Sequence, residues 1–155
     1  MNAENLGVNY LLTSAAAGLL GVAALELAMW LMTSNGLARG NMIVALGGLL
    51  TRSRTNAFRV GLAAHLLAGV VFALLYVWGL RAAGLTHFPT VLAAGVGFGV
   101  VHGIFVSLML VWVIADHHPL EEFKDADLAI GLSHVAGHMA YGMTVGLVVG
   151  LVSLG

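Results

Sequence analysis

The sequence contains no cysteine, only two prolines and few charged residues. Without cysteine, disulfides, iron–sulfur clusters, thiolate zinc sites and cysteine nucleophiles are all excluded. Charged residues make up 8% of the chain, whereas soluble domains average about a quarter. The net charge of −1 gives no electrostatic footprint for nucleic acid. Motifs of soluble enzymes, such as a phosphate loop or a nucleophile elbow, are also absent.

Hydrophobic residues are abundant instead: they form 60% of the 155 residues, and glycine adds 21. Four apolar stretches are each long enough to cross a hydrocarbon core, which takes about 20 residues of helix. They cover 9–33, 58–80, 89–115 and 128–152. Because they lack the alternation of barrel strands, they predict helices. The sequence therefore predicts a single transmembrane domain over 1–155, an all-α, polytopic membrane four-helix bundle.

The connections between these spans differ in length and charge. The short connection 81–88 predicts that the second and third spans are antiparallel neighbours. The connection 34–57 contains an apolar run, Met42 to Leu50, that is too short to cross the membrane. It predicts a short interfacial half-helix between helices one and two. The arginines of this connection face five acids in 116–127, so the two connections either form ion pairs or are solvated separately.

Basic residues predict the orientation, because cytoplasmic connections carry an excess of lysine and arginine. Five of the six lie in or beside two connections, and the sixth lies on the opposite side: Arg39, Arg52, Arg54, Arg59 and Lys124 against Arg81. This distribution predicts that connections 34–57 and 116–127 are cytoplasmic and that both termini are outside.

The residues most informative about function are five ionisable side chains inside the apolar spans: Glu26, His65, His102, His134 and His138. Such residues are energetically costly in a membrane and usually have a functional reason. All five fall in the cytoplasmic half of the bilayer or at its midplane. Each also lies on the stripe of small residues that marks the packing face of its helix. We therefore expect them to meet at one level of the bundle.

One carboxylate and several imidazoles suit a first-row transition metal ion such as iron, copper, zinc or manganese. His134 and His138, four residues apart, present two ligands on one helix face. A haem b between His65 and His138 is the alternative cofactor, but it leaves Glu26, His102 and His134 unused. Two further alternatives are a purely structural subunit with hydrogen-bonded core histidines and a small proton or metal-ion conduit.

Other polar or soft side chains have plainer interpretations. Methionines in the spans are interpreted as core or lipid-facing residues. Asp116, His117 and His118 are interpreted as a solvated group at the end of the third span. Asp125 or Asp127 is expected to cap the fourth helix.

Segments of three spans resemble a family of small bacterial four-helix integral membrane proteins whose function is uncharacterised. The matching segments are AHLLAG (64–69), FALLY (72–76), GVVHG (99–103) and HMAYG (138–142). The family ends its third span with a stretch rich in methionine and proline, whereas this chain has ADHHP at 115–119. The resemblance implies the fold, the histidines as family features and a bacterial inner membrane, but no particular chemistry.

Together these observations predict a membrane protein that holds a metal centre within its bundle. Because so little of the chain lies outside the bilayer, no separate substrate domain is expected. The favoured role is therefore an accessory or redox subunit of a larger membrane oxidoreductase complex, such as a respiratory complex. Its partners would be lipid and other membrane subunits, or further copies of the same chain.

Overall fold

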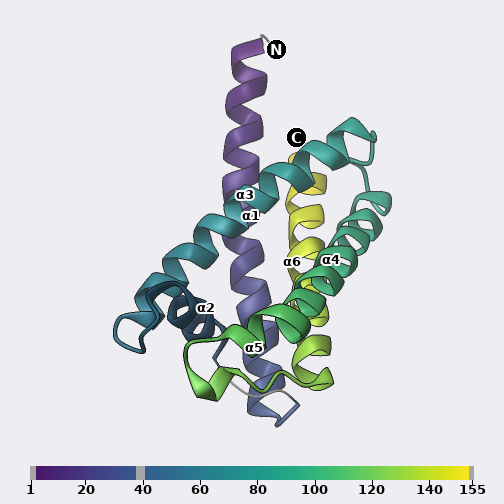
Figure 1. Cartoon of the computed structure of the whole chain (residues 1–155). Helices are drawn as coiled ribbons and strands as arrows, with labels where there is room; N and C mark the ends of the chain where they lie inside the picture. The colour runs from purple at the N-terminus through teal and green to yellow at the C-terminus, as the bar shows by residue number, and fades with distance from the viewer. Residues whose placement is uncertain (1–2, 38–40, 154–155) are drawn as a thin grey trace.

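The computed structural model describes residues 3–37 and 41–153, which fold into helices joined by short connections (Figure 1). No strand occurs in these ranges, in agreement with the predicted all-α fold. In chain order the elements are α1 (Ala3–Ser34), α2 (Met42–Thr51), α3 (Ala57–Ala82), α4 (Thr90–Met109), the π-helical segment η1 (Leu110–Ile114), α5 (Ala115–His117), the 3-10 turn η2 (Glu121–Phe123) and α6 (Leu128–Val152).

Four helical stretches of the described chain are long and apolar enough to cross a membrane: Asn5–Ser34, Ala57–Ala82, Thr90–His117 and Leu128–Val152. Large apolar side chains are exposed along their outer faces, for example Leu12, Phe105 and Trp112, which are 66%, 64% and 72% exposed. Exposure of this extent suits a chain whose outer surface is covered by lipid. The membrane four-helix bundle is therefore confirmed, as is the short α2 between the first two spans.

The tightest interface joins α4 and α6, which are in contact along most of their length. Small residues allow this approach: a Cβ at Gly99 would overlap the His138 carbonyl oxygen, and one at Gly142 would overlap the Gly95 carbonyl oxygen. Close backbone approach through glycine is the usual way in which membrane helices pack without a hydrophobic driving force. The glycine stripes predicted on these two helices are both buried here.

Helix α1 packs against both α6 and α3. On the α6 side, Gly21 accommodates the Tyr141 ring, and a Cβ at Gly21 would lie 2.7 Å from it. On the α3 side, a Cβ at Gly18 would lie 2.8 Å from the Gly69 carbonyl oxygen. Helix α2 packs on the start of α3, where Gly61 approaches the Ile43 carbonyl oxygen.

Helices α3 and α4 diverge from the short connection that joins them, and they touch at only a few positions (Figure 1). The two spans are antiparallel, as predicted, but they are neighbours only at these few positions. The reason is that the glycine face of α4 is used by α6, whereas the small residues of α3 are used by α1 and α2.

Tyrosine hydroxyls attach α3 to the rest of the bundle. Tyr10 of α1 donates to the Leu74 carbonyl (2.6 Å), and Tyr141 of α6 donates to the Gly69 carbonyl (2.6 Å). Tyr76 of α3 donates to the Phe98 carbonyl of α4 (3.0 Å). All three tyrosines of the chain thus form hydrogen bonds between helices.

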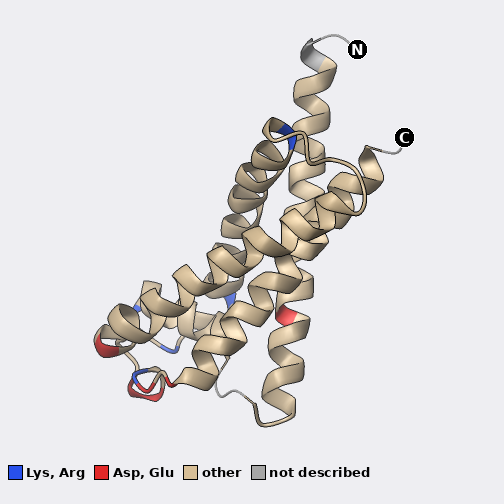
Figure 2. Ribbon diagram, turned by 90° about the vertical axis from the view of Figure 1, so that its right-hand side faces the viewer, with Lys and Arg blue, Asp and Glu red and all other residues tan. Residues whose placement is uncertain are grey.

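Most charged residues gather at the end of the bundle that lies opposite the two termini (Figure 2). There, Arg54 and Glu122 form an ion pair between the first and third connections. Of the two alternatives, pairing is therefore the one observed. Asp127 caps α6 by accepting from the Ile130 amide (2.9 Å), as expected. Arg39 lies outside the described residues.

Candidate functional site: a cavity lined by imidazoles

The divergence of α3 from α4 leaves a cavity of about 400 Å³ between α2 and α3 on one wall and α4, η1 and α6 on the other. Small-molecule and cofactor sites commonly have volumes of about 300–1,000 Å³. Most of the lining is apolar, with Leu25 of α1, Phe72 of α3 and Val106 of α4 as examples. Four of the five predicted site residues also line it: His65, His102, His134 and His138.

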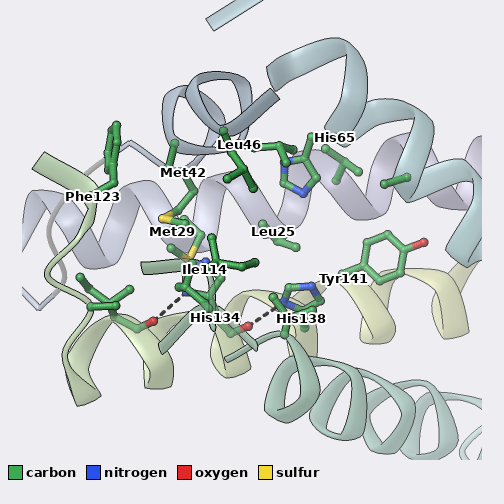
Figure 3. Close-up of a pocket in the computed structure, with 18 of the residues that line it drawn as sticks. Leu25, Met29, Met42, Leu46, His65, Ile114, Phe123, His134, His138 and Tyr141 are labelled. Carbon is green, nitrogen blue, oxygen red and sulfur yellow. Dashed lines mark hydrogen bonds between the residues drawn. The ribbon is translucent and has the colours of Figure 1, made fainter. Parts of the chain in front are cut away.

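Two of these histidines project from α6 into the cavity (Figure 3). The Nδ1 atom of His134 lies 2.7 Å from the Ile130 carbonyl oxygen, and that of His138 lies 2.8 Å from the His134 carbonyl oxygen. Because a carbonyl oxygen only accepts hydrogen bonds, Nδ1 must carry the hydrogen in both rings. In a neutral imidazole the lone pair is then on Nε2.

His102 of α4 is oriented by Tyr76 of α3. Its Nδ1 lies 3.2 Å from the Tyr76 hydroxyl, which donates its own hydrogen to the Phe98 carbonyl. The hydroxyl oxygen therefore accepts from His102 Nδ1, and Nε2 again holds the lone pair. The His102 ring is also in contact with the His138 ring, with 4.5 Å between the ring centroids.

His65 of α3 faces the α6 histidines from the opposite wall (Figure 3). Its Nδ1 lies 2.8 Å from Glu26 Oε1 of α1. The contact lacks the alignment of a hydrogen bond, and Oε1 is the one buried side-chain polar atom in the described chain without such a bond. Glu26 is thus placed behind His65 and does not itself line the cavity.

The four rings therefore share one arrangement, with Nδ1 placed against a protein partner. In His102, His134 and His138, Nδ1 is hydrogen-bonded to a protein partner, whereas in His65 it lies against the Glu26 carboxylate without a hydrogen bond. No hydrogen bond to Nε2 of any of the four rings is found within residues 5–37 and 41–153. Each of these Nε2 atoms keeps some accessible surface, because the only fully buried side-chain polar atom without a hydrogen bond in those ranges is Glu26 Oε1. The Nε2 atoms consequently supply the cavity with several unshared lone pairs.

His118, which lines the polar end of the same cavity, is different. Its Nε2 donates to the Ala45 carbonyl of α2 (2.9 Å), and its Nδ1 accepts from the Leu120 amide (3.1 Å). Both ring nitrogens are thus used for structure. His118 is only 3% exposed, so its interpretation as a solvated residue is wrong, whereas Asp116 and His117 are exposed as expected.

The predicted site residues thus lie in one region of the bundle, but they do not all contact one another. Within the described parts of the chain, no three histidine, aspartate or glutamate side chains converge closely enough to hold an ion in the arrangement seen. The cavity itself separates His65 from the α6 histidines (Figure 3). Whether the five residues are ligands therefore stays a prediction.

Two cavity-lining features were not found from the sequence. One is Met42, which reaches the cavity from α2 beside Met29 of α1. The other is the π-helical segment η1, whose Leu110 and Ile114 line the cavity. Such π-helical turns within α-helices occur frequently at functional sites. No proline or polar residue marks this one in the sequence, since it reads LVWVI.

Comparison of the chain with known protein families, with curated proteins and with solved structures finds no match. The resemblance to the family of small bacterial membrane proteins therefore stays a prediction.

Proposed function

We propose that this protein holds a transition-metal centre in its intramembrane cavity through imidazole Nε2 atoms, as an accessory or redox subunit of a membrane oxidoreductase. The observation that supports this function is the shared arrangement of the four histidines. Each places Nδ1 against a protein partner and leaves Nε2 toward the cavity. Histidines that bind metals almost always donate their other ring N–H to a carbonyl, carboxylate or water.

The partner of each ring fits this role. His134 and His138 donate to backbone carbonyls, and His65 is placed against a carboxylate. Glu26 would therefore act behind His65, orienting its ring as a ligand, rather than bind the metal directly. A bound metal would supply Lewis acidity or electron transfer at a site shielded from water.

Haem b is the second candidate, and the placement of two histidines on opposite walls of the cavity supports it. A haem takes one axial imidazole from each side and needs apolar room between them. His65 and His138 lie on opposite walls of an apolar cavity (Figure 3).

A purely structural role accounts for fewer of these contacts. Histidines that stabilise a membrane bundle do so by hydrogen bonds between helices. Only one of the four rings makes such a bond, His102 with Tyr76, while His65 lies against Glu26 of α1 without a hydrogen bond. His134 and His138 bond to carbonyls of their own helix, so their Nε2 atoms contribute nothing to helix association.

The test is the metal content and absorption spectrum of the full chain, purified in detergent without a polyhistidine tag. We expect about one equivalent of a transition metal per chain, and a Soret band if the centre is haem. His134→Ala and His138→Ala should each lower the occupancy at least tenfold. His87→Ala is the matched control, because His87 is exposed and lies outside the cavity.

Folded protein that binds neither metal nor haem would overturn the proposal and leave the structural role. Ion flux into liposomes without stable binding would instead indicate a conduit.

The distribution of basic residues supports a further part of the proposal, the orientation. Arg52, Arg54 and Arg59 lie at the end opposite the termini, and we propose that this end is cytoplasmic in a bacterial inner membrane. Because the chain lacks cysteine, single cysteines report each side cleanly. Thr55→Cys should react with an impermeant maleimide only from the cytoplasmic side, and Ser153→Cys only from the outside. The reverse pattern would overturn the orientation.

A further inference from the structure

The polar half of the cavity contains thioethers as well as imidazoles. Met29 of α1 and Met42 of α2 both line it, and Figure 3 shows their sulfur atoms on the side where His134 lies. Met29 is 5% exposed, and its Sδ packs against the α6 turn that contains Gly137, 3.4 Å from the position of a Cβ there. Three helices thus bring two sulfur donors and one imidazole to the same part of the cavity.

These two methionines differ from others in the membrane spans. Met139 and Met143 of α6 are 37% and 50% exposed on the outer face of the bundle, where lipid covers them. Met29 and Met42 instead face inward from different helices. Filling an irregular gap is the ordinary use of a buried methionine. Met29 belongs to the buried core and Met42 packs against it, and both also border the open space of the cavity.

The donor chemistry restricts the metal. Thioether sulfur is a soft ligand that selects Cu(I), whereas imidazole accepts several first-row metals. With cysteine absent, methionine is the only source of soft ligands in the chain. Mixed donors also fit the finding that no three histidine, aspartate or glutamate side chains of the described residues converge. An ion bound by sulfur and nitrogen does not need such a group.

We infer that the cavity binds copper as Cu(I), with Met29, Met42 and His134 as donors. This inference rests on the proposed metal-binding function and specifies the metal. Met29 and Met42 then determine selectivity for copper over zinc or cobalt. His134 contributes the unshared Nε2 lone pair that its Nδ1 bond to Ile130 leaves available.

The test is Cu(I) affinity of the full chain in detergent, measured anaerobically by competition with a chromogenic Cu(I) chelator. Met29→Leu and Met42→Leu should each weaken Cu(I) binding at least tenfold, and the double variant at least a hundredfold. Binding of Co²⁺, followed by its absorption bands, should change less than twofold in the same variants. Leucine nearly conserves the volume of methionine, so folding should be retained, and the thermal unfolding of each variant verifies it.

Met139→Leu and Met143→Leu are the matched controls, because they remove the same sulfur atoms from the outer face of α6. They should leave Cu(I) affinity unchanged. Unchanged Cu(I) affinity in a folded Met29→Leu/Met42→Leu variant would overturn the inference. Wild-type protein that binds Co²⁺, Zn²⁺ or haem but not Cu(I) would also overturn it, while leaving the proposed function intact. Protein that binds no metal at all would contradict both.

Discussion

The two walls of the cavity are built in different ways. On one wall, α4 and α6 pack backbone to backbone through glycines, so that a Cβ at Gly99 or Gly142 would overlap a carbonyl oxygen. On the other wall, α3 meets these helices at few positions and is attached by tyrosine hydroxyls. The interface between α4 and α6 therefore has no room for a ligand, whereas the gap between α3 and these two helices contains a cavity of about 400 Å³. The comparison shows that the cavity exists where close helix packing stops.

This difference also divides the candidate ligands. His134 and His138 lie on the tightly packed helix α6, where side chains on a rigid element hold their geometry. His65 lies on α3, which is held mainly by hydrogen bonds to its backbone and by α1 and α2. A metal or haem that bridges the walls would therefore reduce the movement of α3 more than that of α6.

The largest expected effect comes from breaking the packed wall. Gly99→Leu forces a side chain into the His138 backbone, which cannot move aside as a flexible side chain would. We expect a loss of about 3 kcal/mol or more in unfolding free energy, the upper part of the range for overpacked cores. The measurement is unfolding in mixed detergent micelles, followed by circular dichroism.

Gly97→Leu is the control for this prediction. Gly97 is exposed on the same helix, and a Cβ there would meet nothing within 4 Å. Its unfolding midpoint should stay near that of the wild type. Equal midpoints for the two variants would mean that the α4–α6 contact is not the stable part of the fold.

The second effect concerns the polar end of the cavity. His118→Ala removes the bond to the Ala45 carbonyl and leaves the Leu120 amide without its acceptor. We expect a loss of about 1–3 kcal/mol, the cost of leaving a buried polar group unsatisfied. Hydrogen exchange should become faster in α2 and in 116–127. His117→Ala, which loses only a bond to the Val113 carbonyl at an exposed position, should leave exchange in α2 unchanged.

The third prediction tests how far a tyrosine hydroxyl holds α3 against α6. Tyr141→Phe removes one hydroxyl that joins α6 to the Gly69 carbonyl. Hydrogen bonds between membrane helices contribute about 0.6 kcal/mol on average and about 1.7 at most. We therefore expect faster hydrogen exchange in α3, with little change in α4. Thr144→Val is the control, since the Thr144 hydroxyl bonds only to the Ala140 carbonyl of its own helix. Equal exchange in the two variants would contradict this role of Tyr141.

Much of this fold follows from the sequence. Hydropathy alone predicts the four spans and the short α2, and the glycine stripes predict the faces that α4 and α6 use. The same stripes do not reveal which helices pair, because α3, with Gly61, Gly69 and Ala73 on one face, also offers small residues for close packing. The divergence of α3 from α4, and with it the cavity, depends on that choice of partners.

Part of the candidate site was also predictable from the sequence. The cost of ionisable groups in lipid identifies Glu26 and the four histidines. Their partners were not predictable, because Nδ1 orientation depends on backbone carbonyls and on the tilt of α3. Met42 and His118 were missed for another reason: each is unremarkable in a sequence and acquires its contact only when α2 folds against the third connection.

The smallest expected effect tests whether an ion pair between connections, rather than the tyrosine hydrogen bonds, holds α3 in place. Glu122→Gln removes the ion pair with Arg54, the one pair in the described chain that links the first and third connections. Both partners are exposed, and such pairs contribute about 0–1 kcal/mol, which salt screens. Glu121→Gln, which breaks only the pair with Lys124 inside its own connection, should therefore behave the same in unfolding assays. A much larger loss for Glu122→Gln, abolished by high salt, would show that the third connection clamps α3. The hydroxyl of Tyr141 would then be secondary in setting the width of the cavity.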